Sequence, residues 1–387
     1  MKKTIKLALV ASLALGATSA FATNGTSLIG YGAKSRGMGG TGIAQFQGAE
    51  SGFNNPALIG YAKSSEGSVG GTYFSPKVTF DNTELGGNEA TSDAAASMIP
   101  AVSLVSKTSE NFAWGLALYG VGGMGVDYRE ATNGNTANDN LLLMRFALPL
   151  AYTISGFSIG LSPVIEYGAL SMNNAATGPA PVNGVTTDIA YGFEVGAAYQ
   201  IAGVTLGLDY KSAVTHDFKN TFSSNAAGNS ELDTPSILGL GVSYEIAGNT
   251  IAFDYKKIGY GSAKGLEDFG WEDQNVFALG YEYAADVWAV RVGYNYGAQP
   301  IALDSNAPLA SGGNTTMGSL AAFPGVTEAH YTLGGSYSFN EKVSLDAAFV
   351  YGTGSATSEF PTAISGGNQI TATNDQTSAT VALNFGF

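Results

Sequence analysis

Apolar and polar residues alternate along most of this chain with the period of a β-strand. Within residues 203–213 the even-numbered positions carry Val, Leu, Leu and Tyr, whereas the odd-numbered positions carry Thr, Gly, Asp and Lys. Residues 233–246 and 286–297 repeat the pattern. Because successive side chains on a strand point to opposite faces, each segment has an apolar face with aromatics near its end and a second face that is polar or empty.

Fourteen such segments can be counted, joined alternately by tight turns such as Ser155-Gly156 and by long polar connections such as residues 298–326. The expected strands are 66–75, 98–106, 111–121, 141–153, 156–168, 185–201, 203–213, 233–246, 250–260, 273–284, 286–297, 327–339, 342–353 and 376–387.

The placement of the aromatics separates two all-β folds. A soluble β-sandwich would bury mainly aliphatic residues, whereas a membrane barrel carries aromatic girdles at its two interfaces and small or polar residues in its lumen. We therefore predict an all-β protein, a 14-stranded antiparallel transmembrane β-barrel. The last strand must close against the first to remove the sheet edges, and it ends on Phe387, which we expect the barrel assembly machinery to recognise.

The first residues support export. Residues 1–22 contain three lysines, a short apolar run and an Ala-Phe-Ala end, which is the pattern of a cleaved signal peptide. Removing them changes the net charge from −14 to −17. We expect residence in the outer membrane of a Gram-negative bacterium, as a monomer.

Composition excludes several kinds of function. An acidic chain without a basic stripe does not favour a nucleic-acid partner, and the absence of cysteine removes disulfides and thiolate sites. The enzyme alternative is an outer-membrane phospholipase, but His216 and His330 lie far apart and no serine is singled out by its setting. We predict no enzyme activity, no cofactor and no metal site.

Residues 23–62 interrupt the strand pattern. They precede the first strand, lack alternation and are rich in glycine. A barrel of about 14 strands is wide enough to leave a hole unless something fills it. We predict that residues 23–62 form an N-terminal hatch inside a barrel of residues 63–387, because irregular backbone is tolerated there away from lipid.

The residues of this segment carry a family resemblance. The stretches "GTSLIGYGAKSRGMGGTGIA" and "SGFNNPALIG", followed by fourteen strands and a terminal Phe, resemble the FadL-type outer-membrane transport family of long-chain fatty acid transporters and toluene/xylene porins. The resemblance implies that Asn55, Pro56 and Ala57 match the family's Asn-Pro-Ala motif in the hatch. It also implies that this motif lies beside a kink in the third strand, where a gap lets hydrophobic substrate leave sideways into the outer-membrane lipid.

The third strand contains residues suited to such a gap. Its alternation ends after Leu118, and Gly120, Gly122 and Gly123 follow. Glycines at the end of a strand mark a bulge, a bend or a close backbone approach. We predict the lateral opening here; the alternative is an ordinary glycine-rich start of a loop.

Candidate ligand contacts come from two places. Phe53, Leu58 and Ile59 flank the Asn-Pro-Ala motif, and the fourth strand carries Leu141, Leu143 and Arg145. No Arg or Lys occurs between Arg145 and Lys211, where the fatty-acid transporters place a basic residue, and this favours a neutral hydrocarbon or aromatic. Arg145, Lys256 and Arg291 could serve an anion, or they could pair with acids such as Asp254 and Glu282.

The prediction for function is passive transport of a hydrophobic small molecule. The alternatives are a general porin for small polar solutes and a structural or adhesive barrel. A porin needs an open, charged lumen, whereas several lumenal positions of the fourth strand are apolar.

We expect the mature protein to begin at Thr23. N-terminal sequencing of the membrane-extracted protein checks this, and an intact Met1 would contradict the signal-peptide interpretation.

Overall fold

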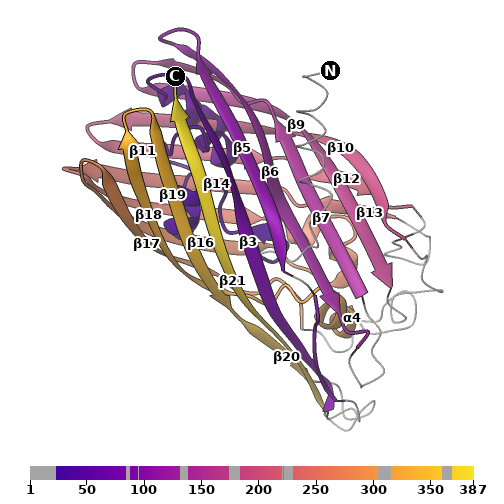
Figure 1. The fold of residues 1–387 in the computed structure, drawn as a ribbon. Helices are drawn as coiled ribbons and strands as arrows, with labels where there is room; N and C mark the ends of the chain where they lie inside the picture. Colours follow the sequence, from indigo (N-terminus) through magenta and orange to yellow (C-terminus); the bar gives the residue numbers. More distant parts are fainter. Residues whose placement is uncertain are drawn as a thin grey trace, which may run out of the picture.

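The computed structural model describes residues 23–83, 88–94, 96–130, 138–173, 184–219, 221, 230–303, 315–359 and 368–387. The predicted signal peptide therefore lies outside the described residues. Among these residues, fourteen antiparallel wall strands close into a barrel (Figure 1). They are β3 (Glu66–Asp81), β5 (Ser97–Lys107), β6 (Phe112–Asp127), β7 (Asn138–Ala147) continued by β8 (Leu150–Ile154), β9 (Phe157–Asn173), β10 (Thr186–Ile201), β11 (Val204–Lys211), β14 (Ile237–Ile246), β15 (Asn249–Ile258), β16 (Gln274–Ala284), β17 (Trp288–Gly297), β18 (Ala329–Asn340), β19 (Val343–Thr353) continued by β20 (Ser355–Glu359), and β21 (Gln369–Gly386).

The barrel closes where β21 pairs with β3 in one long antiparallel ladder, from Gly386 opposite Glu66 to Thr371 opposite Asp81. This ladder removes the sheet edges, so the predicted fold and strand number are confirmed. Tight turns such as residues 202–203 alternate with long connections such as residues 259–273. In outer-membrane barrels the short turns face the periplasm and the long loops face outward.

Two predicted strands differ from the structure. The fourth strand is interrupted between β7 and β8 at Leu148 and Pro149, because Pro149 has no backbone N–H for the ladder. The eighth begins at Ile237, since residues 231–234 form β13 (Glu231–Thr234), which pairs with β12 (Val214–Asp217) as a separate ribbon. The sequence does not separate β13 from β14, because the apolar alternation runs through both strands. They differ in the strands with which they pair.

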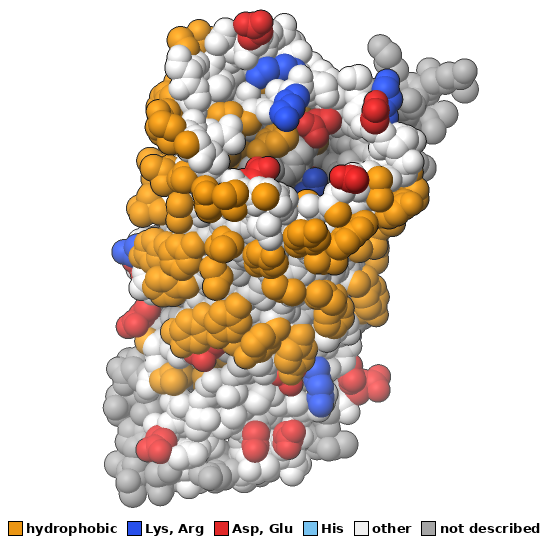
Figure 2. Space-filling view, turned by 90° about the vertical axis from the view of Figure 1, so that its left-hand side faces the viewer, with side chains coloured by type: hydrophobic (Ala, Val, Ile, Leu, Met, Phe, Trp, Pro, Cys, Tyr) orange, Lys and Arg blue, Asp and Glu red, His pale blue; other side chains and the backbone are white. Residues whose placement is uncertain are grey.

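The outer surface of the barrel is apolar. Figure 2 shows hydrophobic side chains gathered in a band across one face, with most charged side chains above or below it. Large apolar side chains such as Leu240, Leu279 and Leu333 are about half exposed along the wall strands. This is the lipid-facing band of a membrane barrel, and the alternation predicts it. None of the helices in the described part of the chain is long and apolar enough to cross a membrane.

Residues 23–62, here called the interior segment, are nearly all buried. Figure 1 shows this indigo segment inside the ring of strands. The segment contains short elements only: β1 (Thr23–Asn24), β2 (Ser27–Leu28), α2 (Ala33–Gly37), α3 (Ser51–Asn54) and the 3-10 helix η1 (Pro56–Tyr61). It exchanges hydrogen bonds with strands around the whole wall, through Ser68 on β3, Ser158 on β9, Ser243 on β14, Asp254 on β15, Asn295 on β17, Thr332 on β18 and Ser378 on β21. It therefore lies in the lumen.

A set of inward-facing wall glycines lets the interior segment approach the wall backbone to backbone. We call them the glycine belt: Gly160, Gly196, Gly207, Gly241, Gly280, Gly293 and Gly334. A Cβ added to Gly293 would collide with the backbone of Met38 and Gly39, and one added to Gly207 would collide with Ile43. Three pairs of belt glycines are direct cross-strand partners, Gly160 with Gly196, Gly207 with Gly241, and Gly280 with Gly293. These glycines therefore determine how closely the interior segment can approach the wall.

Neighbouring glycines on β18 allow a matched test of the belt. A Cβ on Gly334 would lie 2.9 Å from the Cα of Gly37, whereas one on Gly335 would meet only a backbone oxygen, at 3.4 Å. We expect Gly334→Val to displace the interior segment at a cost of about 1–3 kcal/mol. Protease sensitivity of residues 23–62 and single-channel conductance should both rise in a barrel that still assembles. Gly335→Val should behave as the parent; equal behaviour of the two variants would contradict the belt.

Candidate functional site

The barrel wall is interrupted between β5 and β6. Their ladder ends at the pair Ala101 and Tyr119, beyond which β5 continues to pair only with β3. The register of β6 with β7 shifts between Gly120 and Gly122, which marks a bulge. Among the described residues, no ladder joins Gly120–Asp127 to β5. The bulge lies at the glycines where the sequence predicted an interruption.

The burial of β6 shows that its second half leaves the lipid-facing surface. Alternate residues up to Leu118 are exposed or partly exposed, whereas every residue from Tyr119 to Val126 is buried. Strand β6 therefore bends inward at the bulge and leaves an unpaired edge toward β5. Behind this edge lie apolar side chains, including Val121, Met124 and Leu143.

The start of the interior segment covers the unpaired edge. The backbone N–H of Gly123 donates to the oxygen of Thr26 over 3.1 Å, and Ser27 forms a β-bridge with Gly122. The hydroxyl of Tyr31 lies 3.4 Å from the oxygen of Val121. These contacts satisfy backbone groups that lipid could not satisfy, so the edge is compatible with a membrane wall.

A buried ionic network lies beside the bulge, on the lumenal side of β7, β9, β10 and β11. Arg145 contacts Glu166 at 2.6 Å and Glu194 at 2.8 Å, and Lys211 contacts Glu194 and Asp209 at 3.2 Å each. The hydroxyl of Tyr119, the last β6 residue before the bulge, donates to Glu194 over 3.0 Å. Removing one charge from such a group leaves its partners buried and uncompensated.

The same network holds the interior segment. Lys211 Nζ donates to the carbonyl oxygens of Phe53 and Asn54, over 3.2 and 3.4 Å. The Asn54 amide donates to the oxygen of Tyr31 over 2.9 Å. The ring of Tyr119 packs against both Tyr31 and Phe53, with centroids 5.1 and 4.5 Å away. The end of α3 is thereby connected to the residue at which β6 bends.

The hydrogen bonds of the Asn-Pro-Ala segment to the wall go to β9, β10 and β11. Asn55 donates to the oxygens of Ala197 on β10 and Leu208 on β11, over 3.4 and 3.3 Å. Ser158 on β9 donates to the oxygen of Ala57 over 2.7 Å. The residues that contact the bulge are instead Thr26, Ser27 and Tyr31. The glycine belt lets the motif approach these strands closely: a Cβ on Gly160 would meet the backbone of Pro56 and Ala57, and one on Gly196 would meet the side-chain oxygen of Asn55.

The local geometry of the motif is nevertheless fixed. Asn55 has extended backbone angles, φ −156° and ψ 115°, as expected before a proline. Its side-chain oxygen accepts from the N–H of Ala57 over 3.0 Å, and Pro56 starts η1. The Asn55 amide also donates to the oxygen of Ile43 over 2.8 Å. The motif is therefore a rigid capped turn, because the proline ring fixes φ at Pro56.

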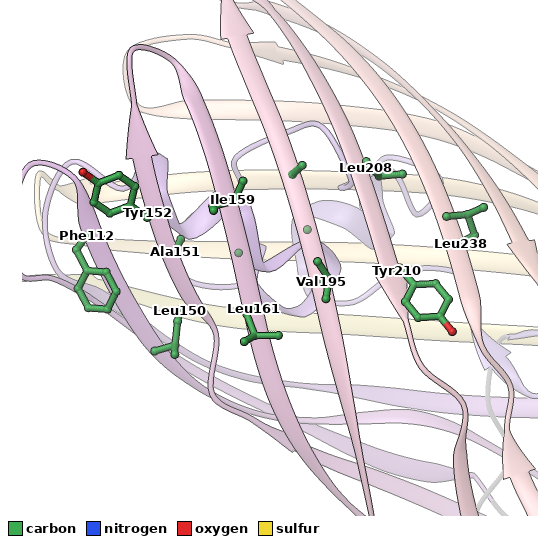
Figure 3. Close-up of a pocket in the computed structure, with 13 residues that line it drawn as sticks. Phe112, Leu150, Ala151, Tyr152, Ile159, Leu161, Val195, Leu208, Tyr210 and Leu238 are labelled. Carbon is green, nitrogen blue, oxygen red and sulfur yellow. The ribbon is translucent and has the colours of Figure 1, made fainter.

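An apolar groove of about 640 Å³ lies on the outer wall, chiefly over β8, β9, β10 and β11 (Figure 3). Its lining includes Leu161, Val195, Leu208 and Leu238, whose exposed fractions lie between 43 and 49%. The ladder between β9 and β10 runs unbroken behind it, from Thr186 to Tyr199 of β10. The groove is a feature of the lipid-facing surface and does not pass through the wall.

The predicted ligand contacts divide into two groups. Phe53, Leu141, Leu143 and Arg145 come together near the bulge; Leu143 is the cross-strand partner of Gly122, and Arg145 that of Tyr119. Leu58 and Ile59 are buried in two separate apolar clusters. Leu58 packs with Ala57 and Ala198, and Ile59 packs with residues such as Val105 and Ala113.

The sequence missed three kinds of residue in this region. The belt glycines occupy the empty positions of the alternating pattern, so parity could have indicated them. Glu166 and Glu194 share the lumenal parity of their strands, but their pairing with Arg145 depends on a register that the sequence does not state. Tyr260, which contacts Thr26 and Ser27, lies in a long loop without any periodic pattern.

Lysine substitutions test the role of the ionic network. We expect Lys211→Met to cost about 3–5 kcal/mol, because Glu194 and Asp209 lose a buried counter-charge. The temperature at which the folded protein loses its separate band on a gel should fall, and hydrogen exchange in residues 53–55 should accelerate. Lys257→Met is the control, because Lys257 pairs with Asp273 at the surface and such pairs contribute little. Matching losses in the two variants would contradict this role.

Comparisons with known proteins agree with this geometry. The crystal structure of a Pseudomonas aeruginosa FadL homologue is similar to this chain with a TM-score of 0.71, at 15% identity, over 94% of this chain and 100% of that one. The Pseudomonas putida toluene transporter TodX gives a TM-score of 0.66 at 17% identity, over 94% of this chain and 100% of that one. The Ralstonia pickettii toluene transporter TbuX gives 0.66 at 17% identity, over 92% and 98%. At these identities the likeness shows the fold.

Sequence comparisons add a family. An uncharacterized protein encoded in the 5′ region of a phosphoenolpyruvate carboxykinase gene of Chlorobium limicola is 44% identical over 87 residues, which are 22% of this chain and 43% of that protein. The model of the outer membrane protein transport family (OMPP1/FadL/TodX) matches residues 7–387. The chain belongs to this family of outer-membrane transport proteins.

Proposed function

We propose that this protein carries hydrophobic compounds passively across the outer membrane and releases them sideways, through the interruption between β5 and β6. The observation that carries the proposal is the inward bend of β6, whose edge has no ladder to β5 from Gly120 onward and is contacted at Gly122 and Gly123 by the interior segment. Apolar residues such as Ile99, Val121 and Met124 are buried together beside this edge and would line the passage once it opens.

The energetics favour a lateral route for an apolar molecule. Transfer from water into the lipid core is favourable by about 0.8 kcal/mol for each buried CH₂. An axial route would release the molecule into the aqueous periplasm instead. The substrate's own gradient is then sufficient to drive transport, and no cofactor or energy source is required.

The interior segment would act as the hatch of this pathway. We propose residues 1–22 as a cleaved signal peptide, 23–62 as the hatch and 63–387 as the barrel. Asn55, Pro56 and Ala57 would hold the hatch against β9–β11, while Gly120, Gly122 and Gly123 form the lateral opening. The contacts of Thr26 and Ser27 with the bulge support a seal at this point.

The charges of the lumen favour a neutral substrate. Arg145 and Arg291 contact carboxylates, and Lys256 donates to the backbone oxygens of Ile29 and Gly40 over 2.8 Å each. Arg291 pairs with Glu282 at 2.5 Å, which supports the second of the two alternatives that the sequence left open for these cations. All three cations that could have received a carboxylate already have partners within the protein. A hydrocarbon or aromatic compound therefore fits better than a fatty-acid anion.

The remaining partners follow from the same pathway. Outer-membrane lipid would receive the substrate at the opening, next to Phe53, Leu141 and Leu143. Phe387, with a side chain that is 71% exposed at the end of β21, is proposed as the signal for the assembly machinery, and the barrel is proposed to act as a monomer.

A reversible disulfide across the opening tests the route. A Cβ on Gly120 would lie 3.9 Å from the Cβ of Ile99, which suits a disulfide, and the chain has no other cysteine. We expect oxidised Ile99→Cys/Gly120→Cys to take up a hydrophobic tracer several-fold more slowly than the parent, with recovery on reduction.

The single variants Ile99→Cys and Gly120→Cys are the controls for packing changes, and they should not respond to reductant. Normal uptake by the oxidised double variant, with the disulfide verified by mass, would show that the substrate takes another route.

A further inference from the structure

The part of the interior segment that covers the opening is a small hairpin, residues 23–28. Its two strands pair with each other, Thr23 with Leu28 and Asn24 with Ser27. Gly25 turns the chain with φ +63°, a conformation that favours glycine. The hairpin contacts β6 through Thr26 and Ser27, and these contacts are all formed by its turn and second strand.

One phenol from an outward-facing loop holds the turn of this hairpin. Tyr260 belongs to η3 (Tyr260–Ser262), in the long connection between β15 and β16, and it is fully buried. Its hydroxyl accepts from the backbone N–H of Thr26 over 2.8 Å and of Ser27 over 3.1 Å, and it donates to the oxygen of Asn24 over 2.6 Å. A single oxygen thus satisfies three backbone groups of the hairpin.

Two long loops enclose the same turn. The rings of Tyr260 and Trp271 pack edge to face, with centroids 4.9 Å apart. A Cβ on Gly25 would lie 2.6 Å from the Tyr260 hydroxyl and 2.8 Å from the Trp271 ring, so the turn fills the space between them. Gly325, in the connection before β18, would bring a Cβ to 3.1 Å from the Cα of Gly25. The tip of the turn at Gly25 is therefore enclosed by the loops, while Thr26 and Ser27 beside it also contact β6.

The rest of the interior segment is held differently. Residues 37–57 lie against the glycine belt and are bonded to wall strands, for example Gly42 and Ile43 to Asp254 over 2.8 and 3.0 Å. Among the described residues, the hairpin bonds to the wall at Gly122 and Gly123 and through the N–H of Thr23, which donates to the side-chain oxygen of Gln376 over 2.9 Å. Movement of the hairpin alone would uncover the opening while the belt stays closed.

We infer that Tyr260 is a positioning residue that couples the outward-facing loop 259–273 to the lateral opening. When the loop holds the turn, Thr26 and Ser27 stay on the edge of β6. When a displacement of the loop withdraws the phenol, the hairpin leaves Gly122 and Gly123, and the apolar path into the lipid opens. This inference rests on the proposed lateral release and adds the device that controls it.

A cysteine reporter in the hairpin tests the coupling directly. Leu28 is 9% exposed, lies in β2 and does not contact the Tyr260 hydroxyl, so Leu28→Cys reports on the hairpin without altering the bond under test. Tyr260→Phe keeps the ring and leaves three buried backbone groups without their partner. We expect a lipid-soluble maleimide to label this reporter about tenfold faster in Tyr260→Phe, since unsatisfied buried groups destabilise the seated hairpin. Tracer uptake should rise with the labelling rate.

Tyr128→Phe is the matched control. Tyr128 is also fully buried, in the connection after β6, and its hydroxyl has no hydrogen-bond partner among the described residues. This variant should label and transport as the parent does. If Tyr260→Phe does not assemble, Trp271→Phe provides the second variant. It weakens the packing around Gly25 without removing a hydrogen bond among the described residues.

The outcomes separate the inference from the function on which it rests. Unchanged labelling in Tyr260→Phe would overturn the role of Tyr260, and faster labelling with unchanged uptake would overturn the coupling to transport. Neither result would affect the disulfide test of the lateral route. That route is contradicted only if the oxidised double-cysteine variant still takes up the tracer normally.

Discussion

The fit between the interior segment and the wall depends on one steric constraint, the absence of side chains at the inward-facing glycines of seven strands. Backbone meets backbone at Gly207, Gly293 and Gly334, closer than any Cβ would allow. A polar segment can then occupy the lumen with its backbone groups satisfied by wall side chains such as Asp254 and Thr332. The segment fills the lumen, and it takes a single position because only the glycine positions leave room for its backbone.

The same rule of backbone satisfaction explains the opening. A wall strand in lipid cannot leave its N–H and C=O groups unpaired, so an interrupted ladder needs a substitute partner. β6 solves this by bending inward, where the N–H of Gly123 finds the oxygen of Thr26. The substitute is part of a small hairpin and not part of the wall, so it can move without opening the barrel. In the proposed mechanism, the interruption of the sheet would thereby have a movable cover.

The sequence predicts the wall well because its signal is local. Alternation alone indicates fourteen strands, and Gly120, Gly122 and Gly123 mark the bulge because no other residues tolerate that bend so readily. The pair of Arg291 with Glu282 was also predictable, since a tight turn between β16 and β17 fixes their register. What could not be predicted depends on contacts between distant segments. Three contacts join residues that no local pattern relates. Asn55 bonds to β10 and β11, Arg145 pairs with Glu194, and Tyr260 bonds to the hairpin.

Lateral release requires that an apolar molecule can occupy the space between β5 and β6, and such a molecule can be located directly. A crystal of the protein soaked with an iodinated aromatic hydrocarbon would locate the ligand by the anomalous signal of iodine. The account predicts a peak between Ile99 and Gly122, with the hairpin of residues 23–28 displaced from β6. A peak instead along residues 37–44 beside the glycine belt, with the hairpin in place, would contradict lateral release and support an axial path.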